Sequence, residues 1–287
     1  GVIGDAWVAV LVQAMEAGLD IVSGLHTRLA SVPALVEALK AGLDIVSGMH
    51  VRLRDVPELA EAADRLGRNL IDIRTPPASI AIGTGRKRGG KRLLTVGTDC
   101  ALGKKYTALA LHRAFVGRGI DATFRATGQT GIMIAGSGMP MDAVVADFEA
   151  GAAEMLSPDA PADHWDVIEG QGSIVHPGFA AVSLGLLHGS QPDVFVVCHE
   201  PGRAEMLGTA GFGVPPVDDI VDLTLRLGRR TNPAIRCGGF SFNTSQLDEA
   251  EALALMARES ERLGLPVGDP VRQGAGFDAL VANCLSA

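Results

Sequence analysis

One stretch constrains the fold of this chain more than any other: VGTDCALGKKYTALAL, from Val96 to Leu111. The apolar run that begins at Leu93 predicts a buried strand, and the apolar spacing after Lys104 predicts a helix. Between them, the turn from Gly97 to Gly103 directs several backbone N–H groups and the positive end of a helix dipole at one point. The stretch therefore predicts a phosphate-binding loop between a strand and a helix.

The loop departs from the usual pattern G-x-x-x-x-G-K-[ST] in a way that bears on its chemistry. Five residues rather than four separate its glycines, and Lys105 stands where a magnesium-binding hydroxyl is expected. Phosphoryl transfer depends on a metal ion, so this change disfavours hydrolysis and favours a phosphate that is held and not cleaved, such as the diphosphate of a nucleotide-derived cofactor. The predicted cofactor-binding residues of the loop are Gly97, Thr98, Asp99, Cys100, Gly103, Lys104, Lys105 and Thr107.

Apolar runs and helical patterns alternate along the chain around and beyond the loop. Strands are predicted at residues 93–96, 122–125, 166–168, 194–198 and 234–242, with helices near 104–118, 141–156, 178–188, 216–228 and 247–263. This alternation is typical of an α/β fold with a mostly parallel sheet covered on both faces. Because such sheets bind ligands outside the carboxyl ends of their strands, the polar residues that follow each strand are the candidates for a site.

Glu169 ends the strand expected beside the loop. It can act as a general base, bind a metal ion or orient Lys104, and a structural ion pair with that lysine is the alternative. His199 offers a titratable imidazole after another strand, and Asn243 offers an amide to a purine edge and joins the predicted cofactor-binding residues. The predicted catalytic residues are Glu169, His199 and Lys104.

Guanidinium, hydroxyl and amide groups recognise carboxylates. The residues predicted to bind an acidic substrate are Arg125, Thr127, Gln129, Thr130, Gln171 and Arg203.

Before the loop, the chain repeats itself. The segment that starts at Ala17 recurs at Ala41, an offset of 24 residues, and each copy predicts a short strand followed by a helix. The strands are predicted at 19–22 and 43–46, and the helix caps at Ser31 and Asp55. Two copies are too few for a solenoid and favour consecutive βα units of a Rossmann-like layer.

The segment from 74 to 91 interrupts this pattern with a proline pair, glycines and a charge run, which predicts a linker. We therefore expect a smaller Rossmann-like domain at residues 1–78 and a P-loop NTPase-like domain with a parallel sheet at residues 79–287. The smaller domain begins at Gly1 without a methionine, and its apolar residues have helical spacing from Val8 to Met15, so we expect this domain to be truncated. A basic run in and just after the linker is expected to be either a solvated surface or a partner for a polyphosphate; its members are Arg86, Lys87, Arg88, Lys91 and Arg92.

The net charge of −8 argues against a nucleic-acid partner, since a phosphate backbone calls for a basic face. The longest apolar runs, such as residues 180–187, are much shorter than the roughly 20 residues of a membrane span. With no leader pattern at the start, we expect no membrane partner and a cytoplasmic protein. Four scattered cysteines without a C-x-x-C pair predict free thiols and no metal site, and a homo-oligomer is left open.

Together with ATGQTG, DVIEGQGS, SLGLLHGSQPD and CHEPGR, the loop resembles the D-glutamate N-acetyltransferase family, formerly a domain of unknown function. The resemblance covers most of residues 17–245. It implies a Rossmann-like domain joined to a P-loop domain similar to dethiobiotin synthetase, and transfer of an acetyl group from acetyl-CoA to the amino group of D-glutamate. The loop residues match the family pattern, but Tyr106 replaces a more usual threonine and the unit GLDIVSGLH is present in two copies rather than one.

The resemblance also implies roles for the residues. CoA carries phosphates and an adenine, for which the loop, the basic run and Asn243 are the expected partners. Glu169 or His199 is expected to accept the amine proton, and Lys104 or the loop N–H groups to stabilise the oxyanion. Two other functions remain open: an ATP-dependent ligase or kinase of the dethiobiotin synthetase type, with Mg²⁺ held through Thr107 or Asp99, and a non-catalytic protein that binds a nucleotide or CoA.

Overall fold

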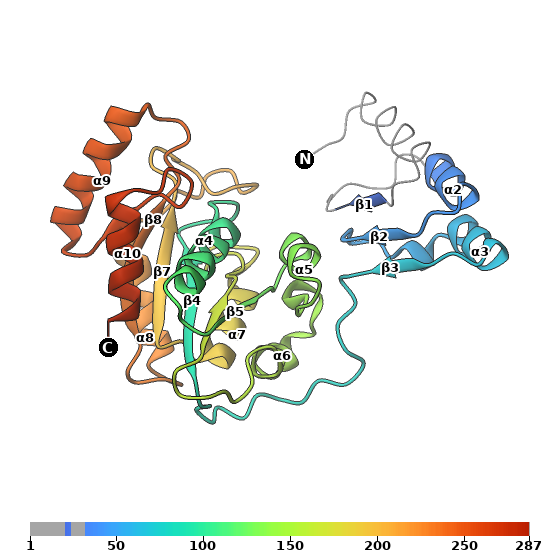
Figure 1. Cartoon of the computed structure of the whole chain (residues 1–287), viewed down its shortest axis with the longest axis horizontal. Helices are drawn as coiled ribbons and strands as arrows, with labels where there is room; N and C mark the ends of the chain where they lie inside the picture. Colours follow the sequence, from blue (N-terminus) through green and yellow to red (C-terminus); the bar gives the residue numbers. More distant parts are fainter. Residues whose placement is uncertain (1–20, 24–31, 287) are drawn as a thin grey trace.

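The computed structural model describes residues 21–23 and 32–286. They form two parallel β-sheets, one of three strands and one of six, connected by an extended segment (Figure 1). The predictions made for Val8 to Met15 and for a helix cap at Ser31 lie outside the described residues. Within the described part of the chain, no helix is long and apolar enough to cross a membrane.

The six-stranded sheet has the order β5-β6-β4-β7-β8-β9, and every neighbouring pair is parallel. The strands are β4 (Lys91–Gly97), β5 (Ala122–Arg125), β6 (Trp165–Ile168), β7 (Val194–His199), β8 (Arg236–Phe242) and β9 (Val267–Gly268). Their carboxyl ends lie at one edge, where Gly97 of β4 pairs with Cys198 of β7. This sheet confirms the predicted α/β fold class and places the phosphate loop at its centre.

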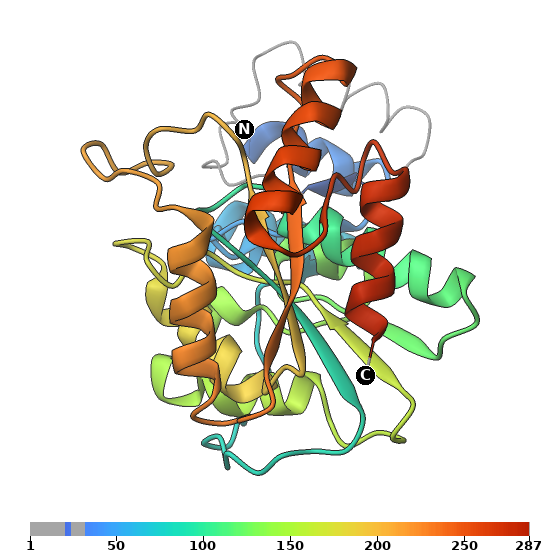
Figure 2. The ribbon, with the colours of Figure 1, turned by 90° about the vertical axis from the view of Figure 1, so that its left-hand side faces the viewer.

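Helices cover both faces of this sheet (Figure 2). Alternate residues of the central strands point to opposite faces, so Leu93 of β4 packs with α4 (Lys104–Gly117) and α10 (Ala275–Leu285). Its neighbour Leu94 packs with the opposite layer, which consists of α6 (Glu149–Leu156), α7 (Ala180–Ser190), α8 (Val217–Gly228) and α9 (Glu249–Leu263). The apolar runs predicted as strands are therefore buried on both sides, as expected for a parallel sheet.

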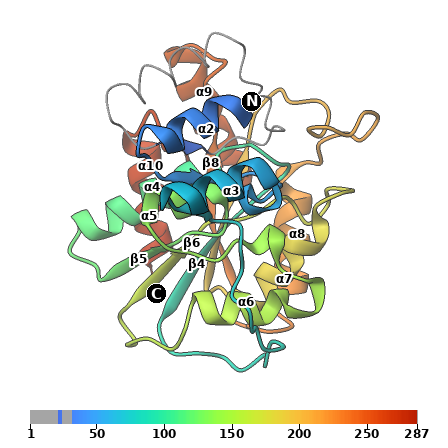
Figure 3. The same ribbon diagram turned by 90° about the vertical axis from the view of Figure 1, so that its right-hand side faces the viewer.

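The three-stranded sheet consists of β1 (Ile21–Ser23), β2 (Ile45–Ser47) and β3 (Leu70–Asp72), all parallel. Helices α2 (Val32–Lys40) and α3 (Pro57–Leu66) lie on its outer side (Figure 3). Leu39, Ile45 and Leu59 are buried in the small core that they share. The carboxyl ends of these strands point toward the larger domain, where helix α5 (Gln129–Ala135) lies (Figure 1).

The segment between β3 and β4 contains no helix or strand and runs along α6 (Figure 1). Glu154 of α6 accepts hydrogen bonds from the backbone N–H groups of Thr84 (2.9 Å) and Gly85 (3.0 Å). Gly83 passes so close that a Cβ atom there would lie 2.7 Å from Cβ of Ala150. The segment is thus attached to the P-loop domain along much of its length.

The basic run does not lie at the phosphate loop, which corrects one of the expectations above. Lys91 and Arg92 begin β4, at the opposite edge of the sheet from Gly97. The buried Arg92 guanidinium donates to Ser157 Oγ (2.6 Å) and to neighbouring carbonyl groups, and Arg88 donates to the carbonyl of Gly189 (2.7 Å). These arginines stabilise the linker, and a polyphosphate at the loop is out of their reach.

Two local predictions were wrong, and some elements were not predicted. The helix predicted from residue 141 begins only at Glu149, because Val144 and Val145 are extended, and β-branched residues are weak helix formers. Asp55 does not cap α3, whose N-cap is Val56, because Asp55 belongs to a short 3₁₀ turn. Helix α5, which begins within ATGQTG, and the last elements, β9 and α10, were not predicted.

Candidate active site

The phosphate loop runs from Gly97, the last residue of β4, to Gly103, the residue before α4. Ala101 (φ 52°) and Gly103 (φ 106°) both have positive φ angles, which turns the chain sharply before the helix begins. Gly103 is the residue before Lys104, so the first N–H groups of α4 follow the turn directly. This geometry is that of an anion-binding loop, as the sequence predicts.

Lys104 is buried, with 6% of its surface exposed. Its ammonium group donates to the backbone carbonyl of Asp99 (2.7 Å) inside the loop. Burial is the largest influence on its pKa and lowers it, since an isolated cation is poorly solvated there. A buried ammonium that contacts a neutral carbonyl gains most from an anion, so the loop is electrostatically prepared for phosphate.

Asp99 is fully buried and is held by Arg203, which follows β7. Arg203 donates to Asp99 Oδ2 (2.8 Å) and to the carbonyl of Cys100 (2.8 Å), and it also pairs with Glu200. Burial alone would raise the pKa of Asp99, but the bonds from Arg203 and from the N–H groups of Leu207 and Cys100 outweigh it and lower the pKa. Arg203, predicted as a substrate contact, thus lies against the loop backbone.

Replacing this guanidinium should destabilise the fold. Arg203→Met is expected to lower the free energy of unfolding by about 2 kcal/mol, because the buried Asp99 carboxylate loses its cation while keeping two amide donors. Urea unfolding at neutral pH measures this loss. The folded-state pKa of Asp99 is lowered, so the stabilisation is present above its unfolded pKa of about 3.9 and disappears as the pH falls through the folded value.

The control for this variant is Arg262→Met, which removes an exposed ion pair with Asp218 (2.9 Å). Exposed pairs contribute little to stability, so little change is expected. Equal losses for both variants at neutral pH, or a loss for Arg203→Met that persists below the folded-state pKa of Asp99, would contradict the buried pairing.

His176 was not predicted and lies beside the loop, buried and stacked on Phe179 with 4.7 Å between ring centroids. Together with Asp99 and Cys100 it offers three potential metal ligands whose atoms lie within 4.8 Å of one another. However, Nδ1 of His176 accepts a hydrogen bond from the N–H of Gly178 (3.0 Å), so Nε2 carries the proton and lies 3.2 Å from the carbonyl of Leu207. With Nε2 protonated and Asp99 bound by Arg203, the groups as arranged suit a hydrogen-bonded network rather than a metal.

Glu169 follows β6 and lies next to the loop, as predicted. Its buried carboxylate accepts hydrogen bonds from the backbone N–H groups of Thr127 (3.0 Å) and Gly128 (3.2 Å). Burial is the largest influence on its pKa and raises it, while these two N–H groups and the charges of Lys105 and Lys104 act in the opposite direction. A carboxylate with a raised pKa beside a phosphate loop has the properties of a general base.

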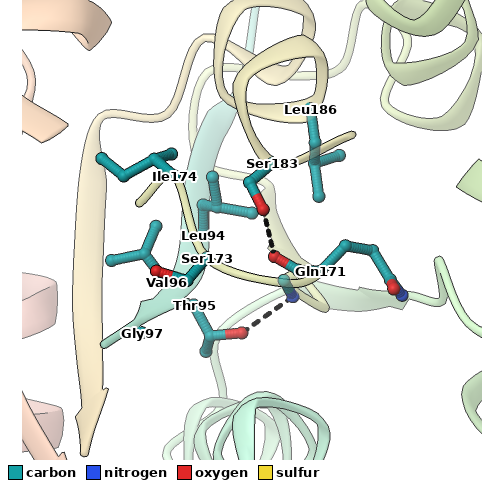
Figure 4. Close-up of a pocket in the computed structure, with 10 residues that line it drawn as sticks. Leu94, Thr95, Val96, Gly97, Gln171, Ser173, Ile174, Ser183 and Leu186 are labelled. Atoms are coloured by element: carbon teal, nitrogen blue, oxygen red, sulfur yellow. Dashed lines mark hydrogen bonds between the residues drawn. The ribbon is translucent and has the colours of Figure 1, made fainter. Parts of the chain in front are cut away.

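The turn after Glu169 is fixed against β4 (Figure 4). The N–H of Gly170 donates to Thr95 Oγ1 (2.9 Å), and a Cβ atom at Gly170 would lie only 1.6 Å from the carbonyl oxygen of Thr95. Ser183 of α7 donates to the carbonyl of Gln171 (2.7 Å). The cavity between these elements is only about 10 Å³, roughly the room for one water molecule. This turn is therefore structural and sets the position of Glu169.

A larger cavity of about 210 Å³ lies on the other side of the loop. It is bounded by the loop and the first turn of α4, by the carboxyl end of β8 and by the segment after β9. Asn243 lies in its wall, as do the apolar residues Leu102, Tyr106, Phe242 and Val271. An apolar chamber with an amide beside a phosphate loop has room for a flat heterocycle, which suits the predicted role of Asn243.

Thr107 is buried, and its hydroxyl is used inside the fold. It lies 2.7 Å from Ser241 Oγ and 3.1 Å from the carbonyl of Gly103, and it accepts from the Cys198 thiol (3.4 Å). The pKa of Cys198 is raised to about 11 by burial. The hydroxyl nearest the usual metal position is thus occupied by internal contacts.

The remaining predicted residues fall into two groups. His199 lies beside the loop, with Nδ1 3.0 Å from Thr98 Oγ1, and burial lowers its pKa. Thr127 bonds to the carbonyl of Glu169 (2.7 Å) and accepts from Gln171 (2.9 Å), so these two residues lie around Glu169. Arg125, in contrast, donates back along the sheet to Asp166 (2.6 Å), so its guanidinium does not point to the loop edge.

The fold and site define a P-loop protein with a phosphate loop at the centre of a parallel sheet and a Rossmann-like domain before it. The profile described as "Domain of unknown function (DUF1611_C) P-loop domain" matches residues 79–281, and that described as "Domain of unknown function (DUF1611_N) Rossmann-like domain" matches residues 1–39 and 31–76. A D-glutamate N-acetyltransferase from Tritonibacter scottomollicae is 50% identical over 284 residues, covering 98% of this chain and 78% of that protein.

A second D-glutamate N-acetyltransferase, from Pseudoalteromonas sp, is 48% identical over 283 residues, covering 99% of this chain and 77% of that protein. The crystal structure of a DUF1611 family protein from Anabaena variabilis superimposes with a TM-score of 0.84 at 34% identity, covering 96% of this chain and 81% of that one. This chain belongs to the D-glutamate N-acetyltransferase family, which confirms the resemblance carried by the sequence motifs.

Proposed function

We propose that this protein is an N-acetyltransferase that transfers the acetyl group of acetyl-CoA to the amino group of D-glutamate. The names of the two relatives at about half identity support the reaction and the acceptor. One structural observation supports acetyl-CoA as the donor. Lys104 is a buried cation in a phosphate loop, while Lys105 replaces the metal-binding hydroxyl and Thr107 is used internally.

The residues around the loop fit the parts of CoA. The loop and Lys104 offer N–H groups and an ammonium to the diphosphate, and the cavity of about 210 Å³ beside Asn243 offers room for the adenine. Lys105, the next residue, offers a second ammonium, which lies 4.9 Å from the centroid of the Tyr106 ring. A diphosphate that is bound but not transferred needs charge compensation and no metal-assisted cleavage, so lysines suffice.

Glu169 is proposed to accept the proton that D-glutamate must lose. The amine of D-glutamate attacks the thioester carbonyl carbon only when it is neutral. In this reaction a C–N bond forms and the C–S bond of acetyl-CoA breaks. The amine proton passes to Glu169, the thiolate of CoA leaves and takes up a proton, and the products are N-acetyl-D-glutamate and CoA. The alternative task of Lys104 and the loop N–H groups, in place of binding the diphosphate, is to stabilise the oxyanion of the tetrahedral intermediate.

The other predicted residues remain proposals in this scheme. His199 lies beside Thr98 and is a second candidate for proton transfer. Thr130, at the start of α5, is a proposed contact of the acidic substrate, whereas Gln129, predicted for the same role, packs against Gly48 of the small domain. Arg203 is proposed to hold the loop in place through Asp99 rather than to bind the substrate directly.

An acetyltransferase and an ATP-dependent ligase make different products, which tests the proposal. With acetyl-CoA, CoA release is expected to require D-glutamate and to be unchanged by EDTA, because no step of the proposed reaction uses a metal ion. With ATP, Mg²⁺ and D-glutamate, no ADP above background is expected. CoA release followed with a thiol reagent and ADP formation followed in a coupled assay measure the two outcomes.

The control omits the acceptor and then replaces it with L-glutamate, which has the same charges. Steady ADP formation without CoA release would overturn the proposal in favour of a ligase or kinase. Tight binding of CoA without either product would indicate a protein that binds the nucleotide without turnover.

A further inference from the structure

The turn after β2 packs directly against α5 of the larger domain. Gly48 is buried, and a Cβ atom at this position would lie 2.6 Å from Cβ and 2.8 Å from Cγ of Gln129, and 3.3 Å from Cε of Met133. Cβ atoms essentially never approach so closely, so only glycine allows this contact. The two domains therefore meet at a tightly packed point.

The opposite side of α5 packs against Glu169. A Cβ atom at Gly131 would lie 2.1 Å from Oε2 of this carboxylate. An α-helix turns by about 100° per residue, so Gln129 and Met133 share one side of α5 while Gly131 lies on the other. Helix α5 thus lies between the N-terminal turn and the carboxylate, and neither Gly48 nor Gly131 leaves room for a Cβ atom at these two contacts.

The backbone that precedes α5 donates the hydrogen bonds that Glu169 accepts. Thr127 and Gly128, whose N–H groups reach Oε2, come immediately before Gln129. A further hydrogen bond fixes this backbone: the N–H of Met141 donates to the carbonyl of Thr127 (3.1 Å). A displacement of α5 therefore changes the hydrogen bonds of the carboxylate directly.

A second contact attaches the linker to the same region. Arg74, just after β3, pairs with Asp142 at 2.6 Å, and only 8% of the Arg74 side chain is exposed. Asp142 follows Met141, whose N–H is bonded to Thr127. The small domain thus contacts α5 through Gly48, and its linker contacts the segment after α5 through Arg74.

We infer that Gly48 and Gln129 are positioning residues for the Glu169 carboxylate, so that the N-terminal domain sets the geometry of the acid–base group. The inference rests on the proposed role of Glu169 as a base. It assigns the small domain a part in the reaction through α5, at the contact between Gly48 and Gln129. The proposed substrate class stays the same, namely an amine that must lose a proton before it reacts.

The pH dependence of turnover reports on this arrangement. The groups that face the carboxylate are the N–H groups of Thr127 and Gly128 on one side and the ammonium groups of Lys104 and Lys105 on the other. All four stabilise the ionised form, so withdrawing the two N–H groups raises the pKa of Glu169. Because the base works when ionised, the acidic limb of the profile then moves to higher pH.

Gly48→Ala tests the inference, since its methyl group must push Gln129 and α5 toward Glu169. Gly131 leaves no room there, so the carboxylate is displaced from the N–H groups of Thr127 and Gly128. The acidic limb of the kcat/KM profile is expected to move up by about one pH unit, which corresponds to the partial loss of a hydrogen bond to a charged group. At pH values below the limb, kcat/KM of the variant is then about tenfold lower than that of the wild type. The Kd for CoA, measured by calorimetry, and the KM for D-glutamate above the limb should be unchanged.

The matched control is Gly117→Ala at the exposed end of α4, where an added Cβ meets nothing within 4 Å; its profile should equal that of the wild type. In the double variant Gly48→Ala/Gln129→Gly the colliding atoms are absent, so its acidic limb should return to that of Gln129→Gly alone. Arg74→Met, which adds no bulk, should move the limb in the same direction by less and covers the case that Gly48→Ala does not fold.

The outcomes separate this inference from the proposed function. If the wild type releases no CoA with D-glutamate, the proposed function fails. If the wild type is active and the limb stays in place in Gly48→Ala and Arg74→Met, the positioning role is overturned while the function stands. A rise in the KM for D-glutamate with an unmoved limb also overturns it and would place the substrate itself at the turn.

Discussion

Lys104→Met is expected to raise the dissociation constant of CoA about 1,000-fold, close to 4 kcal/mol of binding free energy. The methionine keeps the buried apolar stem and removes the charge, so the fold should persist. The effect is large because the ammonium group is buried and lies within the loop, where water cannot replace it. Calorimetric titration with CoA measures the change, and the same experiment with ATP tests whether the loop prefers one nucleotide.

Lys91→Met is the matched control for this variant. Lys91 is the first residue of β4, the strand whose other end leads into the loop, and its ammonium group lies 5.4 Å from the centroid of the Trp165 ring. It carries the same charge but lies far from the loop, so CoA affinity should not change. A Lys104→Met protein that is folded and binds CoA within about twofold of the wild type would mean that the anion does not lie in the loop.

The loop and the central sheet could be predicted because their signals are local. A buried strand, a glycine turn and a helix follow one another within the stretch from Leu93 to Leu111, and the pattern that predicts each of them lies within that stretch. The residues after each strand were also predicted to meet, because parallel strands end at the same edge. Glu169, His199 and Asn243 lie around the loop for this reason.

What could not be predicted depends on contacts between distant residues. Arg92 looks like a free surface charge in the sequence, yet it is fully buried because Ser157 and several carbonyl groups surround it. His176 has no motif of its own, and only the fold brings it to Asp99. Helix α5 was not predicted because glycines disfavour a helix in an isolated chain, whereas Gly131 is required by the carboxylate beside it.

A prediction of similar size concerns the base. Glu169→Gln is expected to lower kcat about 1,000-fold while leaving CoA affinity unchanged, because an amide of the same shape still accepts from Thr127 but takes up no proton. Steady-state kinetics with D-glutamate and acetyl-CoA measure the loss. Calorimetry on the same protein separates it from a loss of binding.

The matched control is Glu149→Gln in α6, another largely buried carboxyl whose pKa is raised by burial but which lies away from the loop. Its kcat should remain near that of the wild type. The wild-type profile should rise with pH through the pKa of Glu169, which burial places above the ordinary value of about 4.3. This acidic limb should vanish in Glu169→Gln and persist in Glu149→Gln. Full activity of Glu169→Gln would transfer the role of base to His199, whose lowered pKa also keeps it neutral near pH 7.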